Sequence, residues 1–183
     1  MAYTHGRFSR LQWLGAVLLG AVCATPAAGQ QFLSLGAGAS FPTGTVRTGM
    51  DPGWMSEVMG GVVLPGNFAS VRVGAMYGQS RVGGGSGMMA AESGTQSILG
   101  AMGGFMVMPD WNRDWVPYLL ATAGAISAEY EGRMTSFAWS TGAGATLRWE
   151  ALDFYVEGRF MQASKGSARG EMVSVTSGIR FSR

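Results

Sequence analysis

The sequence predicts an all-β protein, an eight-stranded antiparallel up-and-down transmembrane β-barrel that follows a cleaved signal peptide. The first observation is that the last dozen residues alternate between two kinds of side chain, as in a strand with two different environments. The second is that similar segments of about ten residues recur upstream, the length that a tilted strand needs to cross a bilayer. The third is that aromatic residues gather near both ends of these segments, as in the interfacial girdles of membrane barrels.

Residues 1–29 have the anatomy of a secretory signal peptide. Arg7 and Arg10 form a basic start, residues 11–24 are an apolar run, and residues 25–29 supply small residues for cleavage. The alternative is a membrane anchor, but the apolar run falls short of the roughly 20 residues that a spanning helix needs. We therefore expect an exported mature domain over residues 30–183.

Removal of the signal peptide changes what the composition implies. Arg7 and Arg10 leave with it, so 11 of the 13 basic residues remain against 11 acidic ones, and no basic patch predicts nucleic-acid binding. His5 and Cys23 are the only histidine and cysteine of the chain, and both lie in the peptide. A mature chain without cysteine has no disulfides, which excludes a small disulfide-stabilised scaffold.

Eight segments alternate as strands, although the faces of the fifth cannot be assigned because it is apolar on both sides. The connections predict the topology, because longer ones alternate with short ones, as extracellular loops alternate with periplasmic turns in outer-membrane barrels. The expected strands cover residues 31–41, 54–64, 68–79, 96–108, 116–130, 136–149, 152–163 and 172–183.

The last strand shows the expected division of faces. Val173 and Phe181 belong to its apolar side, whereas Thr176 and Arg180 belong to the other side. If apolar residues face lipid, the charged residues of these strands lie in a lumen just wide enough for side chains to fill, where charges must pair. The residues expected in this polar lumen network are Glu57, Arg72, Arg148, Tyr155, Glu157, Arg159 and Arg180.

Residues 155–160 (Tyr-Val-Glu-Gly-Arg-Phe) and 176–181 (Thr-Ser-Gly-Ile-Arg-Phe), together with the signal peptide and the eight alternating segments, resemble the small eight-stranded outer-membrane β-barrel proteins of the OmpA-like and OmpX-like group within the porin superfamily. The resemblance implies that Thr176, Gly178 and Phe181 form the assembly signal that barrel-assembly machinery recognises. Here Ser182 and Arg183 follow the aromatic residue, which usually ends the chain in this family.

The mature chain has few of the residues that catalysis or metal binding requires. The acyltransferases and deacylases among such barrels need a histidine, and without one a Ser-His nucleophile cannot be assembled. The aspartates lack the spacing of a calcium loop, and no histidine or cysteine is left for a transition metal. We expect no enzymatic activity, no cofactor and no metal.

Three functions remain open. The first is a monomeric barrel in the outer membrane, in contact with its lipid, that has a structural or surface-interaction role with an unknown surface ligand. The second is a small porin-like pore for ions or small solutes, with a mild preference for anions. The third and least favoured is a periplasmic lipocalin-like binder, which would need apolar residues inside and charged residues outside.

Overall fold

A computed structural model describes residues 30–44, 50–82, 94–109, 113–129, 133–149, 152–165 and 168–182. The expected signal peptide lies outside these residues. The described chain consists of eight strands, each antiparallel to its neighbours, and β1 pairs with β8 to close the barrel. The strands are β1 (Gln31–Thr43), β2 (Gly53–Val63), β3 (Ala69–Val82), β4 (Gly94–Val107), β5 (Trp115–Glu129), β6 (Arg133–Trp149), β7 (Leu152–Lys165) and β8 (Ala168–Ser182).

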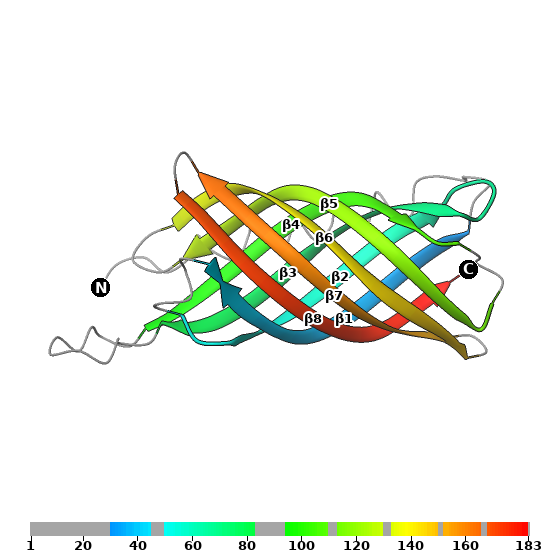
Figure 1. The fold of residues 1–183 in the computed structure, drawn as a ribbon, viewed down its shortest axis with the longest axis horizontal. Coiled ribbons are helices and arrows are strands. Elements are labelled where there is room, and N and C mark those ends of the chain that lie inside the picture. The colour runs from blue at the N-terminus through cyan, green and yellow to red at the C-terminus, as the bar shows by residue number, and fades with distance from the viewer. Residues whose placement is uncertain are drawn as a thin grey trace, which may run out of the picture.

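The closed antiparallel barrel predicted from the sequence is confirmed, and Figure 1 shows its strands inclined to the long axis. We call the end that holds Gln31 and Ser182 the terminal end, at the right of Figure 1, and the opposite end the loop end. The turn between β2 and β3 lies at the terminal end, where Gly66 and Asn67 adopt positive φ angles of 94° and 57°. Glycine and asparagine tolerate this left-handed conformation best, which fits the short connection between the expected strands 54–64 and 68–79.

Several strands are longer than the alternation indicated, mostly toward the loop end. The expected seventh strand ends at residue 163 and the eighth starts at residue 172, but β7 continues to Lys165 and β8 starts at Ala168, with these two residues paired. Each added pair satisfies backbone hydrogen-bonding groups, so the ladder continues although the side chains no longer alternate clearly. None of the residues that the structure describes forms a helix long and apolar enough to cross a membrane.

The outer face of the barrel is apolar and aromatic. Leu119, at 65% exposed, and Val156, at 56%, belong to a belt of exposed aliphatic side chains that encircles the barrel between its aromatic ends, which we call the middle belt. Large exposed apolar patches are rare on soluble monomers, so an apolar surface around the whole barrel indicates contact with lipid. Exposed aromatic residues lie nearer the ends: Phe41, Trp54, Phe137 and Trp139 toward the loop end, and Phe68, Trp115, Trp149, Phe154 and Phe181 toward the terminal end.

Candidate functional site in the barrel lumen

The middle of the lumen holds a cluster of charged side chains from three strands. Glu57 comes from β2, Arg72 from β3, and Glu157 and Arg159 from β7, and each of these residues is at most 3% exposed. Their strands place them there because side chains alternate between the two faces and these positions share the inward face. We refer to these four residues, together with Tyr118 and Tyr155, as the ionic cluster.

Glu157 is the centre of the ionic cluster. Its Oε2 accepts hydrogen bonds from Arg72 Nη1 at 2.9 Å and from Tyr118 Oη at 3.0 Å. Its Oε1 accepts from Arg159 Nε. Both carboxylate oxygens are therefore engaged, as a buried carboxylate requires.

Arg159 links the two carboxylates across the lumen. While its Nε donates to Glu157, its Nη2 donates to Glu57 Oε2. The other oxygen of Glu57, Oε1, accepts from Tyr155 Oη at 3.0 Å. One guanidinium thus connects β2 with β7, which are far apart in sequence, and the planar fork of arginine suits this bridging role.

Arg180 lies next to the ionic cluster in a different environment. Its guanidinium carbon is 4.9 Å from the ring centroid of Phe32 and within 6 Å of the Tyr118 and Tyr155 centroids. Its Nη1 donates to Thr146 Oγ1 at 3.2 Å. Cation–π attraction to three rings therefore stabilises this buried charge, in a side chain that is only 2% exposed.

Glycines leave space for the large lumen side chains. A Cβ atom at Gly144 would lie 2.5 Å from Tyr118 Cζ, far inside van der Waals contact. Position 144 therefore has to be a glycine, without a side chain, if Tyr118 is to reach Glu157.

Apolar side chains lie on both sides of the charged residues. The terminal-end cluster consists of Phe32, Val63, Met106, Met108, Val116, Tyr118 and Leu120. The loop-end cluster consists of Met55, Met76, Met102, Ile126, Ala138 and Met161, against which Ile98, Ala163 and Met172 pack. Along the barrel axis, the ionic cluster thus lies between the two apolar clusters. Tyr118 belongs to both the ionic and the terminal-end cluster, and Arg180 lies against Phe32 and Met106 of the terminal-end cluster.

The structure places the predicted lumen residues in two groups. Six of the seven are buried in the ionic cluster or next to it, namely Glu57, Arg72, Tyr155, Glu157, Arg159 and Arg180. Arg148 also has an inward position, but it is half-buried and pairs in register with Asp153, near the terminal end of β6. Glu157 pairs in register with Gly144, four residues away from Arg148 along β6.

The sequence did not identify Tyr118 or the methionines as lumen residues. Tyr118 belongs to the strand whose faces could not be assigned, yet Val116, Tyr118, Leu120 and Thr122 are all buried and alternate with more exposed residues. The available signal was the pair of hydroxyls of Tyr118 and Thr122, which are four residues apart and therefore share one face of the strand. The methionines offered no such signal, because a methionine side chain is equally compatible with contact with lipid and with a packed lumen.

The residues of the expected assembly signal lie on two faces of β8. Thr176 is buried in the lumen and Gly178 follows on the same inward face, close to Tyr155. Phe181 is exposed on the outer face near the terminal end of the strand.

Comparison with solved structures shows the same fold in known outer-membrane proteins. Neisserial surface protein A (NspA) superposes with a TM-score of 0.60 at 15% identity, covering 86% of this chain and 99% of NspA. Ail, the attachment invasion locus protein of Yersinia pestis, gives a TM-score of 0.50 at 15% identity over 85% of this chain and all of Ail. This chain therefore has the fold of the small eight-stranded outer-membrane barrels. No protein-family model and no curated protein sequence matches it.

Proposed function

We propose that this chain is an integral outer-membrane β-barrel protein with a closed lumen, which serves as a structural or surface-interaction protein and has no enzymatic activity. The observation that supports a closed lumen best is the order of side chains along the barrel axis. Two apolar clusters enclose the ionic cluster, and hydrophobic constrictions oppose ion passage by excluding water.

The surface of the barrel supports its place in a membrane. An apolar belt with aromatic residues at both ends matches a bilayer core and its two interfaces. A sheet in lipid must pair every backbone group, and the pairing of β1 with β8 leaves no free edge. A soluble lipocalin-like binder would expose charged rather than aliphatic side chains between its two ends.

A surface-interaction role agrees with the names of two proteins of similar structure, a surface protein and an attachment invasion locus protein. The identity of 15% to either one supports the fold and not a shared ligand. We further propose that residues 1–29 direct export and that barrel-assembly machinery recognises Thr176, Gly178 and Phe181. A monomer in direct contact with outer-membrane lipid fits a barrel that closes on itself.

Conductance in planar lipid bilayers tests this proposal against the pore alternative. The mature chain, purified in detergent, is expected to show heat-modifiable migration on gels and no discrete conductance steps. Discrete steps would contradict a closed lumen and favour a pore. Recovery in the soluble periplasmic fraction would contradict both membrane roles.

A further inference from the structure

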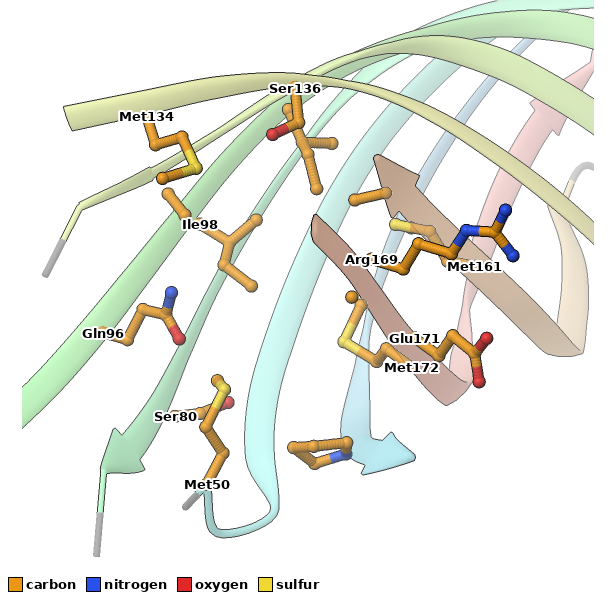
Figure 2. A pocket seen from close by; sticks show the side chains of 15 residues that line it. Met50, Ser80, Gln96, Ile98, Met134, Ser136, Met161, Arg169, Glu171 and Met172 are labelled. Atoms are coloured by element: carbon orange, nitrogen blue, oxygen red, sulfur yellow. The ribbon is translucent and has the colours of Figure 1, made fainter. Parts of the chain in front are cut away.

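A cavity of about 230 Å³ opens inside the loop end of the barrel, between that end and the loop-end cluster (Figure 2). Side chains of five strands (β4, β5, β6, β7 and β8) supply most of its apolar wall, with Pro42 of β1 and Met50 beside them. Because the cavity lies within the ring of strands, it is distinct from the apolar outer face that contacts lipid.

The wall of the cavity is mostly apolar and rich in thioethers, with Ser80, Gln96 and Ser136 as its uncharged polar members. Met50, Met134, Met161 and Met172 line it from separate segments of the chain, and Ile98 lies between them in Figure 2. Methionine is flexible and polarizable, so a wall of this kind adapts to ligands of different shapes.

The cavity ends blindly toward the middle of the barrel. Met161 and Ile126 line it and also belong to the loop-end cluster. Beyond them that cluster continues with Met55, Met76 and Met102, all at most 4% exposed. The cavity is therefore a cup that is closed by packed side chains, and it does not lead to the ionic cluster.

We infer that this cup binds a small, uncharged, apolar molecule, such as a monocyclic or short aliphatic hydrocarbon, that enters from the loop end. Size supports this choice, because an apolar protein cavity of about 150 Å³ already binds benzene. Charge supports it as well: the charged ends of Arg169 and Glu171 point away from Ile98 in Figure 2, so a charged ligand would lack a partner inside.

Methyl NMR of the mature chain in phospholipid nanodiscs, with ¹³C-methyl methionine, tests the inference with toluene as the probe. Saturable shifts are expected for Met161 and Met172, which line the cup. Met106 and Met108, completely buried in the terminal-end cluster, provide the internal control and should not shift.

A matched pair of variants separates binding in the cup from partition into lipid. Ala163→Leu places a larger side chain in the cup and reduces its volume, and we expect about a tenfold loss of toluene affinity, which corresponds to roughly 1.4 kcal/mol. Ala121→Leu makes the same change on the outer face and should leave the affinity unchanged. Both variants are first checked for heat-modifiable migration, which reports the folded barrel.

Shifts that rise linearly with toluene concentration, without saturation, would overturn the inference. So would equal toluene affinities of the two variants, or shifts at Met106 and Met108 as large as those at Met161 and Met172. None of these results bears on the proposed closed lumen, which the conductance measurement tests separately.

Discussion

Replacement of Glu157 by glutamine should destabilise the barrel by about 3 kcal/mol. Glu157 is fully buried and accepts hydrogen bonds from Arg72, Tyr118 and Arg159. The removal of one partner from a buried ion pair costs about 3–5 kcal/mol, because the remaining charge is left uncompensated. Glutamine keeps an oxygen that can accept from Tyr118, so we expect the lower end of this range. Glu157→Leu removes every acceptor and should cost about 5 kcal/mol.

The assay is equilibrium urea unfolding of the barrel in phospholipid vesicles, followed by tryptophan fluorescence. Glu129→Gln is the matched control, because Glu129 is exposed at the loop end of β5, and its free energy of unfolding should change by no more than about 0.5 kcal/mol. A double-mutant cycle of Glu157→Gln with Arg72→Met should give a coupling energy of about 0.5–3 kcal/mol. Equal stabilities of Glu157→Gln and Glu129→Gln would refute the reasoning.

Two further variants test the packing of the lumen and the assembly signal. Gly144→Ala places a methyl group against Tyr118 and should lower the free energy of unfolding by about 1–3 kcal/mol in the same assay. In Gly158→Ala the nearest atom to the new methyl group is Ala143 O at 4.0 Å, so this variant should lose less than about 0.5 kcal/mol. Equal effects of the two alanines would contradict the close packing of Tyr118 and the Val156 carbonyl oxygen against Gly144. Phe181→Ser should lower the amount of barrel in the outer membrane severalfold while leaving refolding into vesicles intact, and Phe154→Ser, at a similarly exposed terminal-end position, should not lower it. Equal membrane yields, measured by fractionation and immunoblotting, would show that Phe181 has no special role in assembly.

The strands with a clear contrast between their faces were predictable from sequence. In β7, Tyr155, Glu157 and Arg159 alternate with Phe154 and Val156, and burial follows the same alternation. The charged side chains could be assigned to one face because an unpaired charge in lipid is costly. Closure then follows because every backbone group of a sheet in lipid must be paired.

The faces of β5 and the apolar part of the lumen could not be predicted in this way. Leu119 is 65% exposed on the outer face, whereas the next residue, Leu120, is buried in the terminal-end cluster. The same residue type thus serves both environments, and only the closure of the barrel decides between them. Met102 and Met161 are similar cases, because hydropathy does not distinguish a packed lumen from contact with lipid.

The central claim is that aliphatic side chains of the middle belt face lipid while the charged side chains are enclosed. Nitroxide spin labels at Val156 and Leu119, introduced through single cysteines, test it through collision rates with oxygen and with a water-soluble nickel chelate. We expect high accessibility to oxygen and low accessibility to nickel at both positions, and the reverse at Glu129 at the loop end. High accessibility to nickel at Val156 and Leu119 would place this belt in water and contradict the claim.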